Sequence, residues 1–370
     1  MQIILVGGIP LNKNNSFFWQ FTLLKKGFLR RNIDTLIVSP IPESDNFKSQ
    51  LNQDNIKYIN YKSSETTLFF KQTLKKDSET YFILLGFPEN FPFLDDIENL
   101  SKFYLWAQFS KPPDLSWKIK NYLNFVPLTE TTSNYIVKSG AKKLSKVIPH
   151  AITTDIYKMY DEVRKKSIIK KYGINGQFVV GTVGKNIMRK RLNDVIEAFA
   201  MASKNISNTI LLIKTDKKVS EFGYNLPFLI ERHKLKHAVK VITGNYDREK
   251  MAEIYNCMDL YLQLSEWEGF GIPVIEAMAC GVPVVTHNVQ GPGEIVNGAG
   301  IIVQSKIQRD DSGAILSYAN IKEVAEAIIR LYKNKSLRDA LILKAHELIL
   351  KRYRIEIVVD LWLKLFYNKT

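Results

Sequence analysis

The stretch Ser265–Pro283, SEWEGFGIPVIEAMACGVP, decides how the second half of this chain folds. It follows the apolar run Met258–Leu264, which is typical of a buried parallel strand. Pro273 suits the first turn of a helix, and Gly281 suits the position just after a helix end. The pattern therefore predicts a strand, a glycine-rich turn and a helix.

Two carboxylates, Glu268 and Glu276, flank this turn. Either one alone has an ordinary explanation, because Glu near a helix start commonly serves as a cap or compensates the helix dipole. However, the amide groups at such a helix start attract phosphate, and ligands of open α/β sheets gather at the carboxyl ends of strands. We therefore predict a substrate-binding turn made of Gly269, Phe270, Gly271 and Ile272.

Length and composition indicate a globular protein of two domains. The chain has 370 residues, which is too long for one ordinary core, and 45% of them are hydrophobic. No apolar run approaches the roughly 20 residues that span a bilayer. The first residues lead directly into a strand without the basic start of a secretory leader, so we expect a cytoplasmic protein. Two free thiols are expected at Cys257 and Cys280.

The net charge of +15 points to an anionic partner. Nucleic acid, an anionic membrane surface and anionic small substrates would each suit it. The basic residues are scattered in short clusters such as Arg189-Lys190-Arg191, and no nucleic-acid-binding module is recognisable. We therefore expect no nucleic acid, while a peripheral position at a membrane surface stays open.

Strand and helix signals alternate along the chain, which indicates an α/β fold with doubly wound parallel sheets. The first helix is predicted at Ser16–Arg30. The predicted strands are Gln2–Val6, Thr35–Ser39, Tyr81–Leu85, Phe103–Ala107, Leu123–Leu128 and Lys146–Pro149, and then one from Phe178, Thr209–Lys214, Val239–Thr243, Asp259–Leu264, Pro283–Thr286 and Gly300–Val303.

A second cluster follows the strand that starts at Phe178. A glycine turn and a basic loop with Lys185 and Lys190 lead into the amphipathic helix Asn193–Ala202. By themselves these lysines would be read as solvated loop charges. Opposite the two glutamates, they are candidates for binding an anionic ligand.

The string Glu-Gly-Phe-Gly-x-Pro-x-x-Glu resembles the retaining glycosyltransferases of family 4, whose signature is two Glu separated by seven residues. The resemblance implies a GT-B fold, in which two Rossmann-like domains face each other across a cleft. It implies that Glu268 lies by the donor sugar and diphosphate, and that Glu276 accepts hydrogen bonds from the ribose. It also implies that Lys185, where the family usually has Arg, and Lys190 bind the donor diphosphate.

The same resemblance suggests domain boundaries. Pro149–Asp155 is similar to the family's linker, with Ala151 in place of its Gly. We expect an acceptor-side domain at 1–150, a nucleotide-sugar domain at 151–353, and a final helix at 354–370 that packs back across the domains. Apolar residues at helical spacing over Ile355–Tyr367 support that helix.

In the first domain, Gly7 and Gly8 follow the first strand and are expected beside the donor phosphates or the acceptor. Several family members carry a His near the reacting sugar, whereas every His here lies at or after His150. Gln108 or Ser110 is the candidate for a hydrogen bond to a sugar in that region.

The sequence therefore predicts a retaining glycosyltransferase that moves a sugar from a nucleotide-diphosphate sugar to a glycan, a lipid-linked or a small-molecule acceptor. We expect no metal and no other cofactor, because the chain has no Asp-x-Asp pair to hold a cation on the diphosphate. Two alternatives stay open. One is a sugar-nucleotide epimerase or phosphorylase on the same fold, and the other is a non-catalytic protein that binds sugar or an anionic surface.

Overall fold

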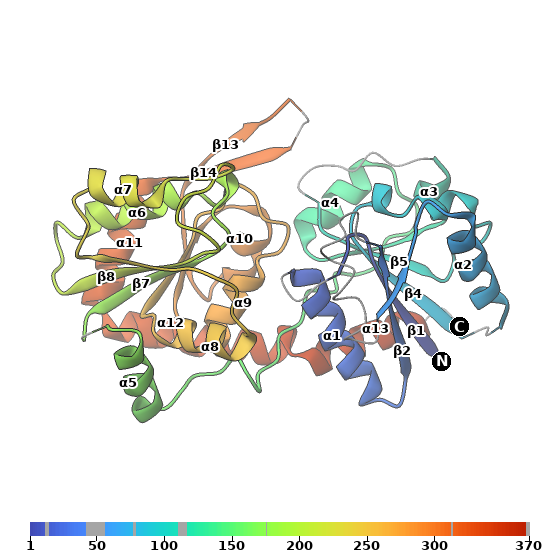
Figure 1. Ribbon diagram of the computed structural model, residues 1–370, viewed down its shortest axis with the longest axis horizontal. Helices are drawn as coiled ribbons and strands as arrows, with labels where there is room; N and C mark the ends of the chain where they lie inside the picture. Colours follow the sequence, from blue (N-terminus) through green and yellow to red (C-terminus); the bar gives the residue numbers. More distant parts are fainter. Residues whose placement is uncertain are drawn as a thin grey trace. The chain divides into compact units, whose positions relative to one another are not determined.

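The computed structural model describes residues 1–11, 15–41, 56–76, 79–109, 117–174, 176–311 and 314–367. The chain forms two compact units (Figure 1). Unit 1 comprises Met1–Ala151 together with Ile355–Thr370, and unit 2 comprises Ile152–Arg354.

Unit 1 is built on a parallel sheet of six strands in the order β3-β2-β1-β4-β5-β6. Its central strands are buried and mostly apolar, as expected of parallel strands covered on both faces. The strands are β1 Gln2–Gly7, β2 Asp34–Pro40, β3 Ile56–Ile59, β4 Thr80–Leu85, β5 Phe103–Ala107 and β6 Asn124–Pro127. The helices are α1 Ser16–Leu29, α2 Ser64–Lys76, α3 Trp117–Tyr122, α4 Glu130–Lys138 and α13 Ile355–Tyr367, with short 3-10 turns η2 Pro88–Asn90 and η3 Pro92–Asp96.

Helix α13 completes unit 1 from the far end of the sequence. Trp362 is fully buried and meets the ring of Trp106 at 5.7 Å, while Phe366 stacks on Tyr81 at 4.5 Å. The helix also lies tightly on α1, where a Cβ on Gly27 would come within 2.6 Å of Val359. The core of unit 1 is therefore made by two segments that are separated by all of unit 2.

Unit 2 repeats the topology with the order β12-β11-β10-β7-β8-β9, again parallel. In both units the strand order reverses beside the first strand, and this switch point is where open α/β sheets bind ligands. The strands are β7 Phe178–Val183, β8 Thr209–Lys214, β9 Val239–Ile242, β10 Leu260–Gln263, β11 Val284–His287 and β12 Ile301–Val303. The helices are α5 Glu162–Lys171, η4 Met188–Lys190, α6 Leu192–Ala202, α7 Leu226–Arg232, α8 Arg248–Asn256, α9 Ile272–Ala279, α10 Gln290–Val296, α11 Ile321–Lys333, α12 Lys335–Leu348 and the π-helical turn η5 Ile349–Tyr353.

An antiparallel ribbon interrupts the alternation of strands and helices in unit 2. It consists of β13 Ser305–Arg309 and β14 Ile315–Ala319, and it projects from the sheet in Figure 1. At its base the Ser317 amide donates to the Glu266 carbonyl at 2.8 Å, and the Ser317 hydroxyl lies 3.1 Å from Nδ1 of the buried His287. The ribbon is therefore fastened to the loop that carries Glu268.

Most predicted elements are confirmed within one or two residues, and β5, β8 and α13 have the predicted bounds. The strand predicted at Lys146–Pro149 is wrong. That segment runs beside β6, where Ile148 donates its amide to Pro127, but Pro149 has no N–H with which to continue a ladder. The edge strand β3 and the ribbon β13–β14 were not predicted.

Candidate functional site

An ion-paired trio lies at the switch point of unit 2. Glu268 follows β10, and Arg189 and Lys190 lie in η4 after β7. Nη1 of Arg189 is 3.1 Å from Oε2 of Glu268, and Nζ of Lys190 pairs with the same oxygen. The side chains of Glu268 and Lys190 are only 16% and 11% exposed, so the trio is largely withdrawn from water.

The electrostatics of the trio favour an anionic ligand. Burial by itself would raise the pKa of Glu268, but Lys190 and Arg189 outweigh that effect and hold the pKa below its usual range. One carboxylate and two cations leave a net positive charge in a site of reduced dielectric, where charges act strongly. A phosphate group would find compensation there.

Arg189 is the residue of this trio that the sequence analysis did not single out. Besides Glu268, its guanidinium donates to the Trp267 carbonyl at 3.2 Å and lies 4.4 Å from the centre of the Trp267 ring. The only signal in the sequence was its place in the basic cluster Arg189-Lys190-Arg191. Lys185, which was singled out, is exposed in the loop between β7 and η4.

The glycine-rich turn has the predicted geometry. Gly271 caps α9 with a φ of +100°, which a side chain would disfavour, and a Cβ there would come within 2.9 Å of Pro292. Pro273 lies in the first turn of α9, and Gly281, with a φ of +73°, follows its end. The first amides of α9 therefore follow Glu268 closely in the sequence, after the carboxyl end of β10.

The residues within the turn differ in accessibility. The Phe270 side chain is buried and lies edge-on to the ring of Tyr353 at 6.0 Å, so it packs in the core of unit 2. Gly269 is also buried, whereas Ile272 is half-buried. The Phe270 ring is therefore part of the core, and only the backbone of this residue is left for the predicted role.

Glu276 lies inside a buried polar cluster. The Tyr255 hydroxyl donates to its Oε2 at 2.8 Å, and Nη1 of Arg248 lies 3.8 Å from its Oε1. The Tyr157 hydroxyl also favours the ionised form of this carboxylate and so lowers its pKa. Burial raises the pKa of Glu276, against the opposing effects of Arg248 and the two hydroxyls.

The first-domain candidates lie in unit 1. A Cβ on Gly7 would meet Leu11 at 2.9 Å, and one on Gly8 would meet Asn90 at 2.9 Å, so close packing alone accounts for both glycines. Gln108 follows β5 at the carboxyl edge of its sheet and is half-buried. The other candidate there, Ser110, lies outside the described residues.

Two buried histidines, His150 and His287, are packing residues in their units. His150 is buried against the Trp106 ring at 4.6 Å, and burial lowers its pKa to about 3. Burial also lowers the pKa of His287 to about 4, while its Nε2 lies 3.0 Å from the Ser265 carbonyl. Both imidazoles are therefore neutral near pH 7.

The described residues contain no cluster of three His, Cys, Asp or Glu side chains placed to hold a metal ion. They also contain no helix with the length and apolar character needed to cross a membrane. Cys257 and Cys280 are buried free thiols.

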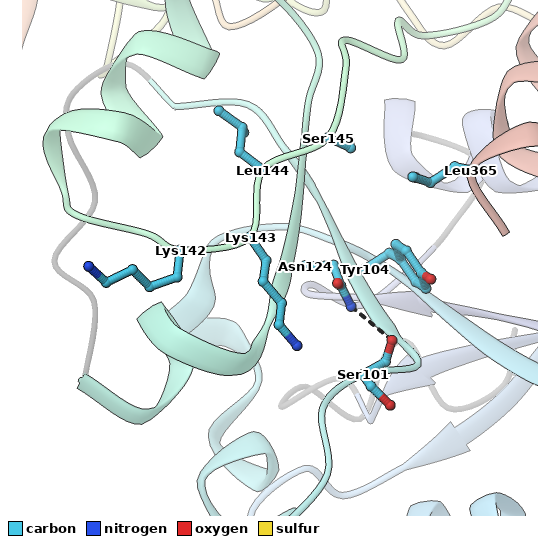
Figure 2. Close-up of a pocket in the computed structure, with 8 residues that line it drawn as sticks. All are labelled: Ser101, Tyr104, Asn124, Lys142, Lys143, Leu144, Ser145 and Leu365. Atoms are coloured by element: carbon cyan, nitrogen blue, oxygen red, sulfur yellow. Dashed lines mark hydrogen bonds between the residues drawn. The ribbon is translucent and has the colours of Figure 1, made fainter. Parts of the chain in front are cut away.

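A pocket of about 470 Å³ lies on unit 1, away from the predicted site residues (Figure 2). Tyr104 and Asn124 are at the amino ends of β5 and β6, so this pocket opens at the edge of the sheet opposite the switch-point residues. Figure 2 shows Lys143 directed toward Ser101 and Asn124, whereas Lys142 points away.

Comparison with known proteins gives a consistent result. A family model described as glycosyl transferases group 1 matches residues 164–348. N-acetyl-alpha-D-glucosaminyl L-malate synthase of Bacillus anthracis is 28% identical over 200 residues, which are 54% of this chain and 48% of that protein. Poly(ribitol-phosphate) alpha-N-acetylglucosaminyltransferase of Staphylococcus aureus is 23% identical over 313 residues, which are 81% of this chain and 58% of that protein. The chain spans about half the length of the curated relatives it matches.

Two solved structures share the fold over the whole chain. A glycosyltransferase from Rickettsia africae superposes with a TM-score of 0.78 at 14% identity, covering 99% of this chain and 98% of that one. HepE of Anabaena, solved with UDP and glucose, gives a TM-score of 0.75 at 15% identity and full coverage of both chains. These likenesses confirm the predicted fold class, two Rossmann-like domains of GT-B type.

Proposed function

The chain belongs to the glycosyl transferases group 1, and on this premise we propose that it is a retaining glycosyltransferase that uses a nucleotide-diphosphate sugar. The observation that carries the proposal is the trio of Arg189, Lys190 and Glu268 at the switch point of unit 2. Its surplus positive charge, together with the amides that begin α9, suits a diphosphate leaving group. Glu276 is assigned to the ribose of the same donor.

The sugar acceptor is a glycan, a lipid-linked molecule or a small molecule. Unit 1 is assigned to it, with Gly7, Gly8 and Gln108 at the carboxyl edge of the sheet as the residues nearest its reacting hydroxyl. A cytoplasmic location, peripheral at an anionic membrane, accords with the net charge of +15.

The proposed chemistry is a front-face attack. The acceptor oxygen bonds to the anomeric carbon as the bond to the diphosphate breaks, and the departing phosphate oxygen takes the acceptor proton. A double displacement would need a carboxylate beneath the sugar, and the segment Phe103–Pro113 has no Asp or Glu. Preorganised positive charge on the leaving group, from Lys190, Arg189, Lys185 and α9, is then the main source of catalysis.

This mechanism fixes the stereochemistry of the product. Incubation with an α-linked nucleotide sugar and an acceptor is expected to give an α-linked product. Proton NMR of the earliest product reports the anomeric configuration directly. A β-linked signal would make the enzyme inverting and would contradict both the mechanism and the retaining assignment.

Turnover is also expected to persist in excess chelator. The cationic side chains and the helix start can neutralise the diphosphate, and the sequence offers no Asp-x-Asp pair for a cation. Initial rates with and without EDTA should agree. A rate abolished by EDTA and restored by magnesium or manganese would refute the metal-independent mechanism.

The Glu276→Gln variant should weaken binding of the nucleoside diphosphate by about 1–3 kcal/mol, the range for losing a charge-assisted hydrogen bond. Calorimetric titration with UDP is the first measurement, because HepE was solved with UDP; GDP and ADP follow. Unchanged affinity in a folded variant would remove Glu276 from the donor site.

A further inference from the structure

Glu276 can bind a ribose only if its carboxylate is held ionised and oriented inside unit 2. It is 8% exposed, and the other buried residues of α9 are all apolar. Burying a carboxylate is costly unless hydrogen bonds and an opposite charge compensate it. The groups that supply this compensation are therefore part of how the site works.

Three side chains supply it, and they come from two other segments. Arg248 and Tyr255 lie at the two ends of α8, and Tyr157 lies in the segment that enters unit 2. Tyr255 donates to Oε2 at 2.8 Å, whereas Arg248 lies 3.8 Å from Oε1. Arg248 also lies 5.9 Å from the ring of Tyr157, and the rings of Tyr157 and Tyr255 are 6.1 Å apart.

The segment that contains Tyr157 is also hydrogen-bonded to α8. The Asn256 side chain accepts from the Tyr160 amide at 2.9 Å and donates to the Lys158 carbonyl at 3.0 Å. These bonds fix the backbone on the C-terminal side of Tyr157, whose hydroxyl favours the ionised form of Glu276. A carboxylate has about four acceptor positions, so two tyrosine hydroxyls leave room for ribose hydroxyls.

We propose that Tyr255, Tyr157 and Arg248 are positioning residues that orient Glu276 toward the donor ribose. None of them needs to touch the nucleotide. This inference rests on the proposed function, because it assumes that Glu276 binds the ribose.

The role predicts a specific pH dependence. Burial raises the pKa of Glu276, and the tyrosine hydroxyls and Arg248 oppose that rise. Removing one hydroxyl should raise the pKa of Glu276 further. As the pH is lowered, nucleotide affinity should therefore begin to fall at a higher pH than in the wild type. The titratable or charged groups that face Glu276 are Tyr157, Arg248, Tyr255, Tyr261 and Cys280.

The test compares Tyr255→Phe with the wild type by calorimetric titration of UDP, GDP and ADP onto the full chain. Affinity for the nucleotide that binds should fall about tenfold at pH 7 and more at pH 6. With donor as substrate, KM should rise while kcat stays within about twofold, because the lost interaction is the same in ground state and transition state.

Two further variants separate positioning from a general structural effect. In a Glu276→Gln background, Tyr255→Phe should cause no additional loss of affinity, because it acts through the carboxylate. Tyr172→Phe is the matched control: the Tyr172 hydroxyl donates to another carboxylate of unit 2, Glu253, at 3.3 Å. It should leave nucleotide affinity unchanged. If Tyr255→Phe does not fold, Tyr157→Phe is measured in the same two backgrounds.

The outcomes are distinguishable. If Glu276→Gln weakens binding and the tyrosine variants do not, the positioning role is overturned while the proposed function stands. Additive losses in the double variant would also overturn it, because the tyrosine would then act independently of Glu276. If the wild type binds none of the three nucleotides, the proposed function fails, and this inference fails with it.

Discussion

Replacing Lys190 with alanine is expected to lower turnover by about two orders of magnitude or more, the usual cost of losing one preorganised charge at a leaving group. Lys190 is the more buried cation of the trio, with 11% of its side chain exposed against 26% for Arg189. Its charge is therefore poorly screened by water and acts strongly on a developing negative charge.

Initial rates at saturating donor measure the effect of Lys190→Ala, and a thermal melt checks the fold. Lys236→Ala is the control, since it also removes one lysine of unit 2 but at an exposed position between α7 and β9. It should change turnover by less than about twofold. Equal rates for Lys190→Ala and the wild type would mean that Lys190 does not act on the leaving group.

Glu268→Gln should affect both catalysis and folding stability. We expect turnover to fall by roughly 10²-fold or more, because the variant changes the charge balance of the trio around the diphosphate. The two cations would also be left in a largely buried site with no carboxylate. Stability at pH 7 should therefore fall by about 1–3 kcal/mol.

The stability loss in Glu268→Gln has a pH signature. Lys190 and Arg189 hold the pKa of Glu268 in the folded protein below its value in the unfolded chain. The carboxylate therefore stabilises the fold when the pH is above the unfolded-chain pKa. Its contribution is lost as the pH falls through the lower, folded pKa. Denaturant unfolding should therefore show a wild-type advantage that is steady near neutral pH and shrinks in acid. A difference that does not depend on pH would rule out the ion pair as its cause.

The fold could be predicted wherever buried residues form a clear apolar pattern in the sequence. Strands such as β5 and β8 are covered on both faces, so they read as unbroken apolar runs. Strand β3 is only partly buried, and four of the five residues of β13 are exposed. Neither carries an apolar run, so periodicity could not reveal them.

Three residues of the candidate site could be predicted from the sequence, but their contacts could not. Glu268, Glu276 and Lys190 stand in a recognisable spacing. No such spacing marks their partners, because Arg189 is 79 residues from Glu268 and Tyr255 is 21 residues from Glu276. Such pairs form only when strands β7 and β10 become neighbours in the sheet and α8 packs beside α9.

Helix α13 also sets the order in which this chain can fold during synthesis. Unit 2 is one continuous segment, so it can fold as soon as Ile152–Arg354 has left the ribosome. Unit 1 cannot bury the faces of Tyr104 and Trp106 until Trp362 and Phe366 arrive, more than two hundred residues later. The half of the protein that is made first is therefore the half that is finished last.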